Sequence, residues 1–415
     1  MKYWLSLASL LFGPCSASAS AQAAPAEASS VQSQALTEQA ESAAIANRAF
    51  GVTLYQRLAA EPGNVFLSPI SLAGAFGPVA AGAQGETRAA IGKVLELPND
   101  DAALHRDLGG LLRTLESDRA GARVSIANGL WLMKDFAVKP AFVAVAKNSY
   151  DAEVESLDFR NGVAAAARIN NWVERKTGGR IPKLIEPDSL DEMTALVVTN
   201  AVHFLGDWTH PFNASNTGSQ PFHLTGGAVR DVPMMYGKRF HRYAETDGVQ
   251  LLELPYKGDR LSMVAILPKE RDGLAAVEKG LDGRRLGQWL GQLDSAQPRE
   301  VRVYLPKVEF RSSYQLVEPL KAMGMSIAFQ PHQANFRGIA DTDLFISQVV
   351  HKTFLRIDEK GTEAAAATGI EAELTSAPAV PPPTFRADHP FLVLIRERPT
   401  GAVLFLGRIA DPSVR

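Results

Sequence analysis

The segment 359–374 restricts the fold of this chain most strongly, because it suits two different secondary structures. Its sequence, EKGTEAAAATGIEAEL, is rich in alanine and has good helix propensity. As a strand it divides by period two into two contrasting faces. One face carries only small or apolar side chains and threonine: Thr362, Ala364, Ala366, Thr368, Ile370, Ala372 and Leu374. Every charge between residues 362 and 374 lies on the other face, with Glu363, Ala365, Ala367, Gly369, Glu371 and Glu373. We interpret the segment as a candidate switch between a loop or helix and a strand.

The candidate switch has recognisable ends. Gly361 provides a permissive backbone at its beginning. No proline occurs between Glu359 and Ala377, whereas Pro378 opens a cluster that continues at residues 381–383. Proline cannot donate to a strand ladder, so we expect an inserted strand to stop before Pro378 and an extended, exposed connection to follow. An ordinary proline-rich surface loop is the alternative.

The rest of the chain predicts one large α+β domain, because helical and strand-like patterns are mixed without strict alternation. Several strand-like runs are apolar on both faces, which is typical of strands covered on two sides. The helical patterns cover residues 37–60, 139–150, 164–176 and 314–323. The strand-like runs cover residues 124–133, 195–205, 251–255, 261–267, 301–305, 344–350, 391–395 and 403–409.

The N-terminus has the features of a secretory signal peptide, which we assign to residues 1–24. Lys2 gives a positive start, Leu5–Phe12 is a short apolar run, and small residues with Ala-x-Ala patterns follow. We expect a disordered segment over residues 25–35 and the folded domain over residues 36–415.

Cysteine usage agrees with export. Cys15 is the single cysteine, and cleavage of the signal removes it, so the mature chain has neither thiol nor disulfide. The residues before Cys15 fit a lipid-anchor signal poorly. We expect a bacterial exported protein, with periplasmic and extracellular locations both open.

Composition and motifs argue against several classes of function. A net charge of −2 gives no reason to expect nucleic acid or an anionic membrane as partner. The chain lacks Gly-x-Ser-x-Gly, Ser-x-x-Lys, His-Glu-x-x-His and Walker-type motifs, and its histidines are scattered. Residues 99–123 mix basic and acidic side chains, as a solvated surface does. We therefore predict no enzyme activity, no metal and no cofactor.

A series of short motifs resembles the serpins, the serine protease inhibitor superfamily. The motif at 359–368 resembles the hinge of their reactive loop. The others follow in the family's order over about residues 36–415: 64–71, 150–154, 200–208, 254–258, 305–307, 351–352, 388–391 and 405–408. Each motif alone is weak, whereas the ordered series is specific.

The resemblance implies a fold with three β-sheets, eight or nine helices and an exposed reactive loop near the C-terminus, here about residues 359–385. It also implies suicide inhibition. A serine protease, or sometimes a cysteine protease, cuts the loop and forms an acyl-enzyme. The loop then inserts into the largest sheet as a new strand and the attached protease is distorted. The implied partner is thus a protease in a covalent 1:1 complex with a monomer.

The resemblance also assigns roles to individual residues. The loop hinge comprises Glu359, Gly361, Thr362, Glu363, Ala364, Ala365, Ala366, Ala367 and Thr368. Ser68, Ser71, Asn200 and His351 match the family's "shutter", a polar cluster beneath the point where strands part. Trp208 matches the "breach", where insertion begins, and Lys307 and Glu359 match an ion pair at the loop base. A plain core aromatic and a satisfied buried histidine are the simpler interpretations of Trp208 and His351.

The family's spacing also predicts the reactive bond. Counting seventeen residues from Glu359 places it at Thr375–Ser376, which suits an elastase-like protease. One residue earlier gives Leu374–Thr375, which suits chymotrypsin- or subtilisin-like enzymes. No Arg or Lys lies between Gly361 and Phe385, which argues against trypsin-like targets. A non-inhibitory serpin acting as carrier, chaperone or storage protein is the alternative, although the small hinge residues favour inhibition.

Overall fold

A computed structural model describes residues 24–116, 122–362 and 381–414 of the chain. The chain divides into two units, Met1–Gln39 and Ala40–Arg415. The helix α1 runs over Ala24–Leu58. Residues 25–35, for which the sequence predicts disorder, lie within α1. All but the last residue of the predicted signal peptide lies outside the described residues.

The unit Ala40–Arg415 contains three β-sheets. The main sheet has the order β11 (Val308–Gln315), β12 (Ile346–Ile357), β4 (Leu196–Asp207), β2 (Ala122–Met133) and β3 (Glu153–Leu157), and β13 (Gly361–Thr362) also pairs with β4. The core sheet has the order β1 (Val65–Leu67), β16 (Val403–Ile409), β15 (Phe391–Glu397), β9 (Leu261–Pro268), β8 (Val249–Pro255) and β7 (Tyr243–Thr246). The small sheet has the order β14 (Thr384–Arg386), β10 (Arg299–Pro306), β6 (Val229–His241) and β5 (Gly218–His223).

Helices and sheets are mixed along the chain, which confirms the α+β prediction. Further helices are α2 (Pro69–Gly82), α3 (Gly85–Leu95), α4 (Asp101–Glu116), α5 (Pro140–Tyr150), α6 (Gly162–Lys176), α7 (Leu274–Lys279), α8 (Gly283–Ser295) and α9 (Val317–Leu320). Each predicted strand overlaps an observed strand, and only residues 195, 344 and 345 of the predicted ranges lie outside one. The helix predicted over residues 314–323 begins too early, because Tyr314 belongs to β11; α9 starts at Val317 and continues into a π-helix over Lys321–Met325.

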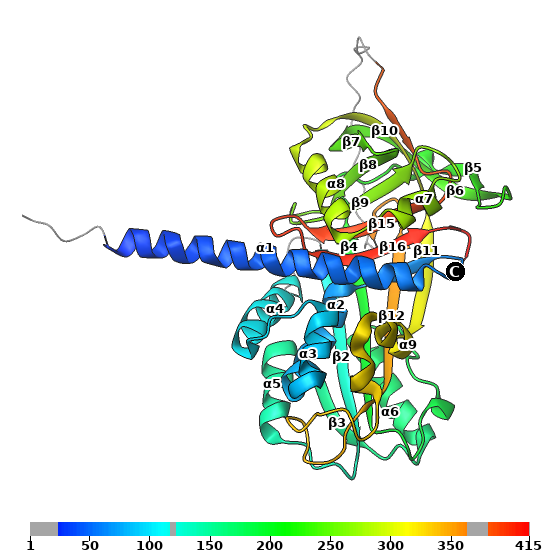
Figure 1. Cartoon of the computed structure of the whole chain (residues 1–415). Coiled ribbons are helices and arrows are strands. Elements are labelled where there is room, and N and C mark those ends of the chain that lie inside the picture. The colour runs from blue at the N-terminus through cyan, green and yellow to red at the C-terminus, as the bar shows by residue number, and fades with distance from the viewer. Residues whose placement is uncertain (1–23, 117–121, 363–380, 415) are drawn as a thin grey trace, which may run out of the picture. The chain divides into compact units, whose positions relative to one another are not determined.

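The main sheet is buried on both faces, as its doubly apolar strands predict. The helix α2 packs on one face, and α6 packs on the other in a separate core cluster that includes Trp131 and Val350. Ser68 caps α2 by accepting a hydrogen bond from the backbone of Ser71, and Pro69 begins the helix. Figure 1 shows α2, α3, α5 and α6 around the strands of the main sheet, with β5, β6 and β10 of the small sheet near the opposite end.

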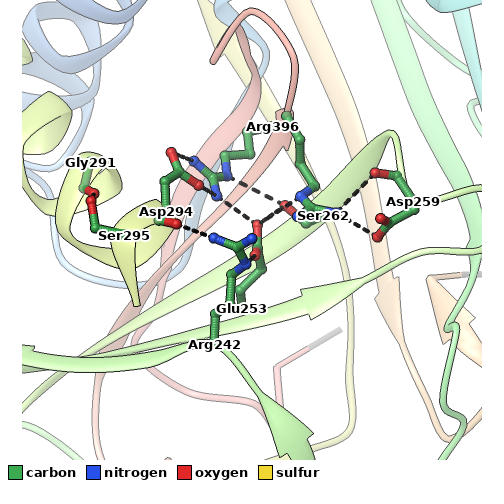
Figure 2. Close-up of polar contacts among 9 residues, drawn as sticks. Arg242, Glu253, Asp259, Ser262, Gly291, Asp294, Ser295 and Arg396 are labelled. Atoms are coloured by element: carbon green, nitrogen blue, oxygen red, sulfur yellow. Dashed lines mark hydrogen bonds and ion pairs between the residues drawn. The ribbon is translucent and has the colours of Figure 1, made fainter. Parts of the chain in front are cut away.

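A buried ion network joins the core sheet to α8. Arg396 on β15, 1% exposed, contacts Glu253 Oε1 on β8 at 2.6 Å and Asp294 Oδ1 on α8 at 2.5 Å. Arg398 and Arg242 also lie within 4 Å of the Glu253 carboxylate, and Ser262 donates to it. Figure 2 shows Asp294 and Glu253 on either side of Arg396. We call these residues the Arg396 network.

Candidate functional site: the loop base and the polar cluster beneath it

The structure brings together the four residues that match the shutter. Asn200 lies on β4, His351 on β12, and Ser68 and Ser71 at the start of α2. The Asn200 amide donates to Ser71 Oγ at 2.5 Å, and its carbonyl oxygen lies 2.6 Å from His351 Nδ1. All four residues are fully buried. Together with Asn128 on β2, whose Oδ1 accepts a bond from Asn200 at 2.6 Å, they form what we call the polar cluster.

The hydrogen bonds of the polar cluster define the state of His351. The backbone N–H of Ser68 donates to Nε2 of His351 at 3.1 Å, so Nε2 is unprotonated. The proton of the neutral ring is then on Nδ1, which donates to Asn200. Burial lowers the pKa of His351 to about 3, because a fully buried imidazolium would lose its hydration. The cluster is therefore neutral at physiological pH.

The bond between His351 and Asn200 crosses the boundary between β12 and β4. These two strands pair in parallel from Ile346 opposite Leu196 to Phe354 opposite His203, and His351 lies directly opposite Asn200. We call this boundary the seam. A strand that entered between β4 and β12 would have to break this ladder and the side-chain bond across it.

Trp208 lies just beyond the far end of the seam. Its indole N–H donates to the carbonyl of Asp358 at 3.0 Å, and its backbone N–H donates to the carbonyl of Lys360 at 2.8 Å. Its ring stacks on Tyr256, with centroids 4.6 Å apart. Trp208 is thus a core aromatic, 1% exposed, that also holds the base of the loop.

The first hinge residues already pair with β4. After β12 the chain turns at Glu359 and Lys360, and β13 returns antiparallel to β4, with Gly361 opposite Asp207 and Thr362 opposite Gly206. Thr362 is fully buried and its hydroxyl lies 2.7 Å from that of Tyr256. Only glycine fits at 361, because an added Cβ would lie 1.9 Å from the carbonyl oxygen of Gly206. Thr362 therefore faces the core, as the period-two pattern predicts.

The loop base also contains the expected ion pair. Lys307 Nζ lies 2.8 Å from Glu359 Oε2, and the other carboxylate oxygen accepts a hydrogen bond from Thr217. Burial opposes the ionisation of Glu359, but these partners outweigh it and lower its pKa. The pair joins the start of the loop to the end of β10.

The remaining predicted site residues lie outside the described residues: Glu363, Ala364, Ala365, Ala366, Ala367, Thr368 and the reactive bond at Leu374, Thr375 and Ser376. Sequence reasoning missed two other contributors, Asn128 and Tyr256. Asn128 is a lone amide in the apolar run 124–133, and that mismatch was the available signal. Tyr256 lies in the motif 254–258, but no local pattern predicts its contact with Thr362.

The family comparison agrees with this arrangement. The profile of the family described as "Serpin (serine protease inhibitor)" matches residues 45–412. The chain belongs to the serpin family. This serpin is 37% identical to the leukocyte elastase inhibitor of Bos taurus over 382 residues, which cover 90% of this chain and all of the relative. It is 39% identical to an uncharacterised serpin-like protein of Thermococcus kodakarensis over 369 residues, covering 88% and 84% of the two chains.

Solved structures agree as well. Uncleaved ovalbumin superposes on this serpin with a TM-score of 0.81 at 30% sequence identity, covering 89% of this chain and 99% of ovalbumin. The serpin fold, with its three sheets, is thereby confirmed. In the part of the chain that the structure describes, no group of three or more His, Cys, Asp or Glu could hold a metal ion. None of the described helices is long and apolar enough to cross a membrane.

Proposed function

We propose that this serpin is a suicide-substrate inhibitor that inserts its cleaved reactive loop into the seam. The observation that carries the proposal is the pairing of Gly361 and Thr362 with β4. The chain has already reversed direction and begun an antiparallel strand at the end of the seam. Insertion would extend a strand whose first two residues are in place.

The register of β13 predicts where each hinge residue would go. Continuing from Thr362 opposite Gly206 places Ala364 opposite Phe204, Ala366 opposite Val202 and Thr368 opposite Asn200. The alternate residues from Ala364 to Leu374 would then share the inward face of Thr362. Thr368 would meet the polar cluster at the position that His351 now occupies across from Asn200. A hydroxyl could replace part of the lost hydrogen bonding there.

Small and apolar side chains make this insertion favourable. Burying Ile370 and Leu374 would contribute roughly 1.5–3 kcal/mol each. New ladder hydrogen bonds on both sides of the strand would add about 1 kcal/mol each. A charge on the inward face would instead cost several kcal/mol if it were buried without a partner.

The proposed partner is a serine protease, or a cysteine protease, held in a covalent 1:1 complex. We place the reactive bond at Thr375–Ser376, with Leu374–Thr375 as the alternative. The first fits an elastase-like enzyme and the second a chymotrypsin- or subtilisin-like enzyme. The bovine relative is named for leukocyte elastase, which supports the first choice. We also propose that the protein is exported through a signal peptide at residues 1–24 and functions as a monomer.

A denaturing gel tests inhibition directly. The purified protein is mixed with elastase-, chymotrypsin- and subtilisin-like proteases, and we expect a complex that survives denaturation with at least one of them. Mass spectrometry of the released C-terminal peptide identifies the cut bond. Clean cleavage by every protease without any complex would contradict inhibition and favour a carrier, chaperone or storage role.

A matched pair of variants tests insertion separately. Thr362 is unsuitable because it is buried before cleavage. Ala366→Arg places a charge on the inward face, whereas Ala365→Arg makes the same change on the outward face. We expect Ala366→Arg to convert the inhibitor into a substrate and Ala365→Arg to trap protease nearly as the wild type does. Equal trapping by both variants would refute the proposed register.

A further inference from the structure

One exposed face of the small sheet combines aromatic and basic side chains with the carboxylate of Glu300, which lies opposite Phe240. The other residues that alternate outward on adjacent strands include Tyr236, Lys238 and Phe240 on β6, Arg302 and Tyr304 on β10, and Arg386 on β14. Their alternating neighbours on β10, Val301 and Val303, are fully buried beneath. We call this surface the outer face of the small sheet.

Side chains pack against one another on one side of the outer face, whereas the other side is exposed to solvent. Arg386 lies over the ring of Tyr304 at 3.5 Å, and the rings of Tyr304 and Tyr236 are 4.8 Å apart. This stack forms a rigid side, since Arg386 is also held by Gln220. Toward the other end, Phe240 is 67% exposed.

The charge of the outer face is positive. Lys238 pairs with Glu300 at 3.0 Å, so these two charges offset each other. Arg302 is exposed, and the structure gives its guanidinium no acidic partner within the described residues. An uncovered arginine beside an uncovered phenylalanine is the composition of an interface centre, where aromatic residues and arginine are enriched.

The position of the outer face identifies its partner. The backbone N–H of Arg302 donates to the carbonyl of Pro383 at 2.9 Å, so the C-terminal end of the loop joins the sheet at Arg302. Pro383 is seven residues after Ser376, a span of at most about 25 Å even when fully extended. A protease of ~230 residues has a radius of gyration of about 17 Å. An enzyme bound at Thr375–Ser376 would therefore reach the outer face with a surface outside its active-site cleft.

We infer that the outer face of the small sheet is a second contact surface for the protease that binds the loop. This inference rests on the proposed function. Its partner surface carries an acidic group for Arg302 beside an apolar patch for Phe240. Such a contact raises the rate of encounter and selects among proteases that accept the same loop sequence.

The test measures the rate of loop consumption, counting trapped and cleaved protein together. The protease is the one of the elastase-, chymotrypsin- and subtilisin-like panel that consumes the loop fastest. We expect Arg302→Glu to lower the second-order rate constant about tenfold and Phe240→Ala to lower it about threefold. The loss with Arg302→Glu should shrink as salt rises, because salt screens exposed charges. A synthetic peptide of residues 362–385 gives the rate for the loop alone.

Matched controls make the same changes elsewhere on the surface. Arg284→Glu reverses a charge on a side chain that is 76% exposed, and Met193→Ala removes an apolar side chain that is 72% exposed. Both should consume the loop at the wild-type rate. Unchanged rates for Arg302→Glu and Phe240→Ala, or wild-type protein no faster than the peptide, would overturn the inference. Cleavage without trapping would refute inhibition, but the rates of loop consumption could still be compared.

Discussion

The polar cluster and the Arg396 network are both buried and polar, yet they differ in charge. The cluster is neutral and sends one side-chain bond, from His351 to Asn200, across the seam. The network places Glu253 among three arginines and joins three strands of the core sheet to α8. A neutral hydrogen bond can be exchanged at small net cost, whereas a buried charge cannot be left unpaired. We therefore expect the proposed insertion to open the main sheet at the seam while the core sheet stays rigid.

Breaking the Arg396 network should cause the largest loss in the free energy of unfolding. Arg396→Met leaves Glu253 buried and short of its nearest partner, and we expect a loss of about 3–5 kcal/mol in the free energy of unfolding. Urea unfolding measures the loss. Arg284→Met, on the exposed surface of α8, is the control and should change little. A loss below about 1 kcal/mol for Arg396→Met would remove the contrast between the two regions.

Breaking the polar cluster should have a smaller effect that depends on the state of the loop. Asn200→Ala leaves the Nδ1–H of His351 and the oxygen of Asn128 without their partner, and we expect a loss of about 1–3 kcal/mol before cleavage. After cleavage the loss should be smaller, since insertion separates His351 from Asn200. Arg396→Met should cost the same in both states. The exposed Asn216→Ala serves as control, and equal losses for Asn200→Ala before and after cleavage would argue against opening at the seam.

Acid should lower the free energy of unfolding, because His351 takes up a proton more readily in the unfolded chain than in the folded protein. An unfolded histidine binds a proton near pH 6.5, while His351 in the folded protein stays neutral down to about pH 3. Stability is therefore unaffected above pH 6.5 and falls below it, by about 1.4 kcal/mol per pH unit for this histidine. Unfolding at a series of pH values between 7 and 4 should show a shallower slope for His351→Gln than for the wild type. His332→Gln, which changes an exposed histidine, serves as the matched control; an unchanged slope for His351→Gln would contradict the burial argument.

The ion pair at the loop base should give the smallest effect. Lys307 is 38% exposed at its side chain, so solvent screens its attraction to Glu359. A double-mutant cycle with Lys307→Ala and Glu359→Ala should return a coupling energy of about 0.2–1 kcal/mol. A coupling above about 2 kcal/mol would mean that the loop base resembles the Arg396 network more than a surface pair.

The sequence predicts the main sheet and the burial of Thr362 well because their patterns are local. The doubly apolar runs lie in the strands of the main and core sheets, and the alternation from Thr362 correctly assigns Thr362 to the inward face. The ordered motifs also selected Ser68, Ser71, Asn200 and His351. These residues are far apart along the chain, so their contacts followed from the resemblance and not from spacing.

Other features depend on tertiary contacts that no local pattern contains. The contact of Tyr256 with Thr362 and the partners of Arg396 join residues more than 100 positions apart. Arg396 lies near the end of an apolar strand, but the sequence around it does not predict Glu253 or Asp294 as its partners. The helix predicted at 314–323 begins three residues too early, because β11 pairs with β12 through Tyr314 and Gln315, and this pairing overrides helix propensity there.

A reversible lock across the seam tests the central claim most directly. Lys352 lies opposite Ala201, and Cys15 is the single native cysteine, so Ala201→Cys and Lys352→Cys in a Cys15→Ser background offer one possible disulfide. The measurement is the fraction of protease trapped in a covalent complex, with the bond oxidised and with the bond reduced. We predict trapping by the reduced protein and cleavage without trapping by the oxidised protein, because the locked strands cannot admit the loop. Equal trapping in both states would contradict insertion between β4 and β12.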